Sequence, residues 1–144
     1  MAVQRMDNVL IVVDDLDAAL AFFVELGLEV EGKTVVEGPS VDRLLALEGV
    51  RADIAVLRTP DDHGRVELTK FHTPAVTGTE PKALNSLGIG RIMFAVDDIE
   101  DVLARLRAHG AELVGELVRY GDSYRLCYVR GPEGVILGLA EKLR

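Results

Sequence analysis

Residues 6–32 read MDNVLIVVDDLDAALAFFVELGLEVEG, and residues 89–115 read IGRIMFAVDDIEDVLARLRAHGAELVG. The two stretches align without a gap. Their identical pairs occupy structurally demanding positions and are Val13/Val96, Asp14/Asp97, Asp15/Asp98, Leu20/Leu103, Ala21/Ala104, Gly27/Gly110, Glu29/Glu112 and Gly32/Gly115. A repeat of this kind predicts that the chain is built from two copies of one structural unit.

Each copy begins with a strand that leads directly into a helix. Residues 9–13 and 92–96 are continuous apolar runs of strand length, and each is followed by a pair of aspartates. Asp15 and Asp98 are suited to accept hydrogen bonds from the first turn of a helix, whose dipole also favours their charge. Gly27 and Gly110 are expected to end the two helices, because a left-handed residue there costs little without a Cβ.

Three further strands follow each helix, separated by turn signals. The expected ranges are 28–36, 52–58 and 65–71 in the first half, and 112–120, 124–130 and 135–140 in the second. An insertion at 41–47 predicts a short helix. A ferredoxin-like βαββαβ sandwich is the alternative, but it needs two strands after the first helix and one after the second.

The expected fold class is α+β, with two paired βαβββ modules that form curled mixed sheets around a concave cleft and carry their helices outside. One domain is expected over residues 1–144, with module one at about 5–72, a linker at 73–87 and module two at about 88–142. The cleft is the default place for a ligand.

Composition indicates which partners the protein is expected to lack and in which compartment it is expected to reside. The formal net charge of −8 opposes nucleic-acid binding, which depends on clustered Lys and Arg. No apolar run is long enough to cross a membrane. The single cysteine, Cys127, lies in an apolar strand pattern and is expected to be a buried structural thiol in a reducing cytoplasm.

Four segments together resemble the vicinal-oxygen-chelate superfamily, also called the glyoxalase/bleomycin-resistance/dioxygenase family. They are MDNVLIVVDDL at 6–16, VEL at 66–68, RIMFAVDD at 91–98 and RGPEGVILGL at 130–139. The resemblance covers nearly the whole chain and implies the paired-module fold. It does not select a reaction, because the family includes lyases, epimerases, ring-cleaving dioxygenases, thiol transferases and antibiotic-binding proteins.

The resemblance also implies positions for a metal-ligand set of two histidines and one or two glutamates. This chain has Asn8 and Arg91 where histidines are typical, keeps Glu67, and has Gly138 in place of the last glutamate. An arginine side chain has no acceptor and stays protonated, so it does not bind a cation. We therefore expect no metal cofactor, with a divalent metal as the alternative.

Strand alternation indicates which side chains share the cleft. If the four degenerate positions converge, Arg91 is either an ion-pair partner of Glu67 or an anchor for an anionic group of a ligand. Tyr124 is a further candidate at the rim, although alternation does not decide which face of residues 124–130 lines the cleft. The predicted ligand-binding residues are Asn8, Glu67, Thr69, Phe71, Arg91, Met93 and Tyr124.

Two functions compete, and a structural or regulatory dimer without its own ligand is a third reading that the sequence leaves open. The first is a protein that binds a small organic molecule in its cleft without the usual metal. The second is a metal-dependent lyase, isomerase or dioxygenase resembling glyoxalase I, in which Glu67 is a metal ligand or the catalytic base. The sequence leaves open whether the protein is an enzyme. A homodimer is expected in either case, because small folds with open sheet edges need those edges covered.

Overall fold

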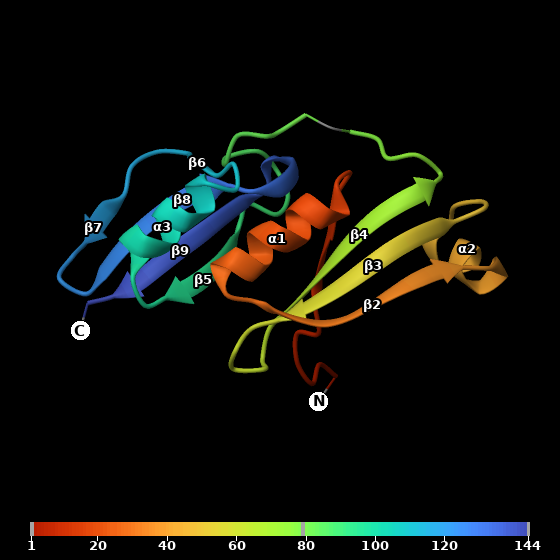
Figure 1. Ribbon diagram of the computed structural model, residues 1–144, viewed down its shortest axis with the longest axis horizontal. Coiled ribbons are helices and arrows are strands. Elements are labelled where there is room, and N and C mark those ends of the chain that lie inside the picture. The colour runs from red at the N-terminus through yellow and green to blue at the C-terminus, as the bar shows by residue number, and fades with distance from the viewer. Residues whose placement is uncertain (1, 79, 144) are drawn as a thin grey trace. The chain divides into compact units, whose positions relative to one another are not determined.

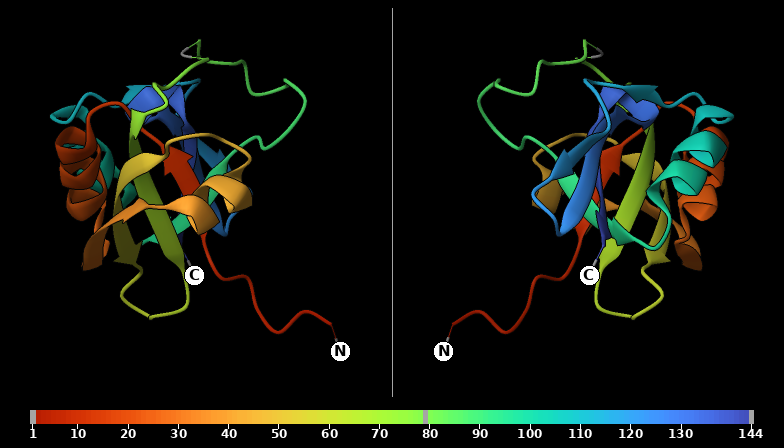
Figure 2. Two further views of the ribbon diagram at one scale, coloured as in Figure 1. Left: turned by 90° about the vertical axis from the view of Figure 1, so that its right-hand side faces the viewer. Right: turned by 90° about the vertical axis from the view of Figure 1, so that its left-hand side faces the viewer.

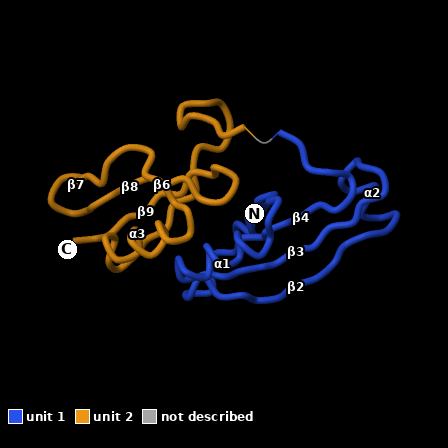
Figure 3. The backbone as a smooth tube through the Cα atoms, turned by 45° about the horizontal axis from the view of Figure 1, so that its top comes forward, with its two compact units in different colours: residues 1–78 blue, residues 79–144 orange. Residues whose placement is uncertain are grey.

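The computed structural model describes residues 2–78 and 80–143, and the chain divides into two compact units, residues 1–78 and 79–144 (Figures 1 and 3). Within the described residues there are nine strands in two mixed sheets, neither closed into a barrel, and three α-helices. Each unit has a strand, a helix and then further strands. The predicted α+β fold of repeated βαβββ modules is therefore confirmed.

The first unit is a four-stranded sheet with a long helix and a short one. Its elements are β1 (Val9–Val12), α1 (Leu16–Leu26), β2 (Glu29–Glu37), α2 (Pro39–Leu45), β3 (Arg51–Arg58) and β4 (Arg65–Thr73). The strand order is β1-β4-β3-β2, in which β1 is parallel to β4 and the other pairs are antiparallel.

The second unit repeats this plan with one strand divided. Its elements are β5 (Ile92–Val96), α3 (Ile99–Arg107), β6 (Glu112–Leu113), β7 (Val118–Tyr120), β8 (Tyr124–Arg130), a 3₁₀ turn (Pro132–Gly134) and β9 (Ile136–Lys142). The order is β5-β9-β8-β6, with β7 also paired to β8. The parallel pair β5–β9 corresponds to β1–β4 of the first unit.

Both long helices begin at the predicted aspartates. The Asp15 carboxylate accepts a hydrogen bond from the Ala18 N–H at 3.0 Å, and Asp98 accepts one from Asp101 at 3.1 Å. These bonds satisfy N–H groups that have no partner within a helix's first turn. The duplicated aspartate is thus the N-cap in both units.

The two helices end differently. α1 ends at Gly27, which has φ 122°, as predicted. The prediction that Gly110 ends α3 directly is wrong, because the regular helix stops at Arg107. The Gly110 N–H then bonds to the Arg107 carbonyl at 3.1 Å, which tightens the last residues into a turn that Gly110 completes with φ 90°.

Each unit has its core between its long helix and one face of its own sheet (Figure 2). In the first unit the buried side chains include Phe22, Phe23, Leu57 and Leu68, and in the second they include Ile99, Leu106, Val129, Leu137 and Leu139. Strand side chains alternate between faces, so the opposite face of each sheet is not covered by the long helix of the same unit.

Two expected segments differ from the structure. The short helix lies at Pro39–Leu45 instead of 41–47, because Pro39 supplies a favourable first helical position. The strand expected at 112–120 is split into β6 and β7. Leu113 pairs with Val129 and Val118 pairs with Leu126, so the intervening segment is longer than its partner and loops out around Gly115.

Cys127 is buried on the helix side of β8, as expected. Burial raises the pKa of its thiol, and the nearby positive charges of Arg107 and Arg125 oppose that shift. In the described part of the chain, no helix is both long and apolar enough to cross a membrane.

Candidate functional site

The open face of the first sheet carries the Glu67 carboxylate among apolar side chains. In the register of β1 with β4, Leu10 lies opposite Glu67 and Val12 lies opposite Thr69, so these side chains share one face. Asn8 is exposed and immediately precedes β1. The first unit therefore places Asn8, just before β1, beside the strand that carries Glu67.

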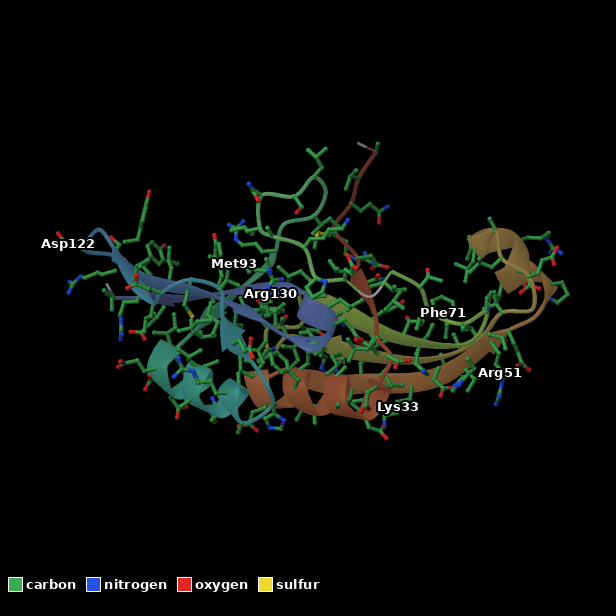
Figure 4. All side chains as sticks on the ribbon, turned by 90° about the horizontal axis from the view of Figure 1, so that it is seen from above. Lys33, Arg51, Phe71, Met93, Asp122 and Arg130 are labelled. Carbon is green, nitrogen blue, oxygen red and sulfur yellow. The ribbon has the colours of Figure 1, made fainter. Side chains whose placement is uncertain are left out.

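Phe71 belongs to the same face, further along β4. Figure 4 shows it on the side of the sheet away from α1, where it is half-buried. Its register partner on β3 is Ala52, which is fully buried. The helix α2 lies on this side of the sheet near the end of β2, with Leu44 82% exposed. Phe71 and Ala52 therefore make this end of the open face apolar.

Thr69 is a buried polar side chain on this face. It is 2% exposed, and its Oγ1 has no hydrogen-bond partner among the described residues. A buried hydroxyl without a partner costs about 1–3 kcal/mol. Glu67, two residues earlier, is half-buried, and its carboxylate forms no hydrogen bond or ion pair with the described residues of the first unit. Two polar groups on the face therefore lack local partners.

Arg65, the nearest cation of β4 on this face, is neutralised locally. Its Nε donates to Glu31 Oε2 at 2.7 Å, and its Nη2 donates to Asp62 Oδ1 at 2.8 Å. The hydrogen bond with Glu31 and, to a smaller extent, that with Asp62 raise the pKa of Arg65. These bonds hold its guanidinium toward β2 and the β3–β4 turn and leave Glu67 without it.

The structure decides which face of β8 is open. Tyr124, Leu126 and Tyr128 share a face with Met93 and Gly138, whereas Cys127 and Val129 are buried toward α3. Figure 4 shows Met93 on the side of the sheet away from α3. Arg125 belongs to the helix side, where it pairs with Glu100 of α3 at 3.3 Å. The predicted residue Tyr124 is on the open face and is 40% exposed.

Gly138 lies in the centre of β9, between Met93 on β5 and Tyr128 on β8. A Cβ placed on Gly138 would fall on Met93 Sδ and would lie 3.2 Å from Tyr128 Cε1. The thioether and the ring therefore fill the space above the glycine. A glutamate at this position would have to displace both of them.

Arg91, the residue before β5, extends to the same ring. Its Cζ lies 5.3 Å from the Tyr128 ring centroid, a cation–π contact that reaches across β9. Arg91 is exposed, and no carboxylate in the described part of the second unit pairs with it. The second unit thus brings Arg91, Met93, Tyr128 and Gly138 together.

The histidines have other surroundings. His72 Nε2 lies 2.8 Å from Asp53 Oδ2, on the pleat side opposite Glu67, and His63 Nδ1 lies 3.9 Å from Asp61 Oδ2 in the β3–β4 turn. His109 follows α3. Across residues 2–78 and 80–143, no group of three or more His, Cys, Asp or Glu side chains is arranged to hold a metal ion.

Sequence reasoning missed the role of Tyr128 and left the face of β8 undecided. A signal was present, because Tyr124 and Tyr128 are separated by an even number of residues and therefore share a side of the strand. The pairing of Tyr120 with Tyr124 adds the remaining tyrosine to that face. That pairing follows from the sheet register, which the sequence pattern did not reveal.

Comparison with known proteins gives one family and a set of similar folds. The family model described as Glyoxalase/Bleomycin resistance protein/Dioxygenase superfamily matches residues 5–139. No match is found among curated proteins. The chain is similar to the crystal structure of a glyoxalase family protein from Bacillus cereus, with 49% identity, a TM-score of 0.95, and coverage of 100% of this chain and 99% of that one.

More distant structures share the fold. A glyoxalase family protein from Enterococcus faecalis has 22% identity and a TM-score of 0.63, with 98% of this chain and 100% of that chain covered. The trypanothione-dependent glyoxalase I of Leishmania major has 20% identity and a TM-score of 0.66, with 96% and 87% covered. At these identities the likeness concerns the fold alone.

Replacing Gly138 by Ala should destabilise the second unit, since the new Cβ competes with Met93 Sδ and the Tyr128 ring. We expect the free energy of unfolding to fall by about 1–3 kcal/mol, as for overpacked cores. Adding Met93→Ala should restore part of that loss. Urea denaturation of both single variants and the double variant measures this coupling. Gly115→Ala is the control, because its Cβ meets nothing within 4 Å, and an equal loss there would contradict the proposed packing.

Replacing Thr69 by Val should leave stability unchanged or raise the free energy of unfolding by about 1 kcal/mol, because it removes a buried hydroxyl without a partner. Thr73→Val is the matched comparison. Its hydroxyl donates to the Gly49 carbonyl at 2.7 Å, so that variant should lose about 1 kcal/mol. Urea denaturation of both variants tests the difference. A clear loss in Thr69→Val would mean that the hydroxyl has a partner in solution.

Proposed function

We propose a function from the premise that the chain belongs to the Glyoxalase/Bleomycin resistance protein/Dioxygenase superfamily, whose model spans residues 5–139. In this proposal the protein binds a small organic molecule on the open sheet face of its second unit, without a divalent metal. The observation that carries the proposal is the packing of Met93 and Tyr128 over Gly138.

The residues present do not fit the metal site that the family resemblance implies. A catalytic divalent site generally holds its ion with three or more protein ligands. Glu67 supplies one carboxylate and Asn8 one neutral amide oxygen, whereas Arg91 is a permanent cation. Gly138 has no ligating side chain, and the space that one would occupy is filled. We therefore derive no chemical step that depends on a metal ion.

The composition of the second open face supports binding of an organic molecule. All three tyrosines of the chain lie on it, at positions 120, 124 and 128. Tyrosine rings give a large apolar contact area with a hydroxyl for orientation. Met93 is 39% exposed beside them, so the apolar floor is accessible. The predicted residues Tyr124 and Met93 contribute to this surface, and their role in binding stays a prediction.

A metal-dependent lyase, isomerase or dioxygenase resembling glyoxalase I is the second candidate. Its support is the open face of the first unit. Among the described residues of that unit, the Glu67 carboxylate has no hydrogen-bond or ion-pair partner, and the buried Thr69 hydroxyl has no hydrogen-bond partner. A carboxylate in that setting is available as a base or ligand. In this candidate Asn8 and Phe71 would contact the substrate.

The two proposed functions predict different metal contents for the purified protein and different effects of a chelator on ligand binding. Elemental analysis of the purified protein is expected to find zinc, nickel, iron and manganese all well below one equivalent. Because the chain has no Trp, its fluorescence comes from the three tyrosines, so small molecules can be screened by the change in tyrosine emission. Chelation with EDTA should leave the affinity of any hit unchanged.

Variants assign a hit to the proposed face. Tyr128→Leu should weaken binding severalfold, because loss of a stacking ring costs on the order of 1 kcal/mol. Tyr120 is 69% exposed, so Tyr120→Phe should mainly lower the intensity of the tyrosine emission and change the binding affinity little. Near-stoichiometric metal that disappears in Glu67→Ala would instead favour the enzyme candidate.

We also propose that the protein is a homodimer in the cytoplasm. The sheet order of the first unit leaves β2 at an edge, and nearly all of its residues are exposed. Unpaired edges of this kind favour association with another chain. The single buried cysteine suits a reducing compartment. Light scattering at micromolar concentration should give twice the chain mass of 15.7 kDa, and a monomer at high micromolar concentration would refute the dimer.

A further inference from the structure

We infer that the second unit's open face selects organic monocarboxylates, with the Arg91 guanidinium stacked on Tyr128 as the anchor for the carboxylate. The inference rests on the proposed function and names the class of its ligand. The apolar or aromatic body of the molecule would lie on the surface formed by Met93, Tyr124, Leu126 and Tyr128.

The first step is the orientation of Arg91. A guanidinium held 5.3 Å from a ring centroid keeps a defined position at little cost in side-chain entropy. Because Gly138 has no side chain, Met93 from β5 and Tyr128 from β8 meet above β9, and the Arg91 guanidinium lies against the same ring. Arg91 is therefore already directed over the face before a ligand arrives.

The second step is its charge. On the helix side of the same unit, Arg105 pairs with Asp101 at 3.2 Å and Arg125 pairs with Glu100 at 3.3 Å. Arg91 has an aromatic ring as its partner instead, and within the described part of its unit no carboxylate neutralises it. A planar guanidinium binds a carboxylate through two parallel hydrogen bonds. The unfilled partner of Arg91 is thus an anion.

The third step concerns the number of charges on the ligand. Arg130, at the end of β8, also lies on this face, but its Nη1 donates to the Gly134 carbonyl at 3.0 Å and its Nη2 to the Lys82 carbonyl at 2.8 Å. Those bonds hold it at the β8–β9 turn. Lys142 pairs with Tyr124 and adds an exposed ammonium to this face, but it lies four residues further along β9 than Gly138 and is a point charge instead of a planar group. Among the described residues of this face, Arg91 is thus the guanidinium available to bind one carboxylate through two parallel hydrogen bonds.

Paired probes of equal shape test this selectivity. We would titrate the protein with 3-phenylpropionate and with its uncharged amide, 3-phenylpropanamide, and follow binding by isothermal titration calorimetry and tyrosine emission. The wild-type protein should bind the carboxylate about fivefold to tenfold more tightly, a moderate effect because Arg91 is exposed. Arg91→Gln should abolish the preference while the amide still binds. Arg91→Lys should keep only part of the preference for the carboxylate, because an ammonium cannot form the two parallel hydrogen bonds of a planar guanidinium.

Arg119→Gln is the matched control, since it removes one positive charge from β7 on the opposite pleat side, opposite Arg125. It should leave the preference intact. Equal binding of both probes by the wild type would overturn the carboxylate inference and leave the proposed function standing, because tyrosine emission would still respond. A preference that persists in Arg91→Gln, or no binding of either probe, would also overturn the inference. The proposed function is tested separately by the tyrosine-emission screen, which also includes uncharged and cationic molecules.

Discussion

A carboxylate at the end of the first strand of each unit is the constraint on which the rest of the structure depends. Asp15 and Asp98 bond to the first turn of α1 and α3, and this fixes where each strand stops and each helix starts. The helix then covers one face of its sheet with an apolar stripe. Because that cover is one-sided, every strand places its alternate side chains on the face that the long helix of its own unit does not cover.

The two copies use their open faces differently. The first presents Glu67 and the Thr69 hydroxyl between apolar neighbours, and the second presents Arg91, Met93 and the three tyrosines. The first face therefore carries negative charge and the second a positive one, although both derive from one repeated plan. Duplicated units preserve the caps that the fold requires, while the open faces are free to change chemistry.

Gly138 has a structural consequence beyond the loss of a potential ligand. In a central strand, a residue without a side chain leaves a gap between the neighbouring strands. Met93 and Tyr128 fill that gap, and the Arg91 guanidinium stacks on the Tyr128 ring. The chain thus has no carboxylate at position 138 and has a guanidinium held against the neighbouring ring.

The sequence alone determined the repeated units, the aspartate caps, the helix at α1 and the face shared by Glu67 and Thr69. These depend on hydrogen bonds and periodicities within a few residues, which a linear pattern records. The tertiary structure alone decided that Tyr128 faces outward, that Met93 covers Gly138 and that residues 112–120 split into β6 and β7. Those features depend on register between strands far apart in the chain, and a slip of one residue would reverse every face.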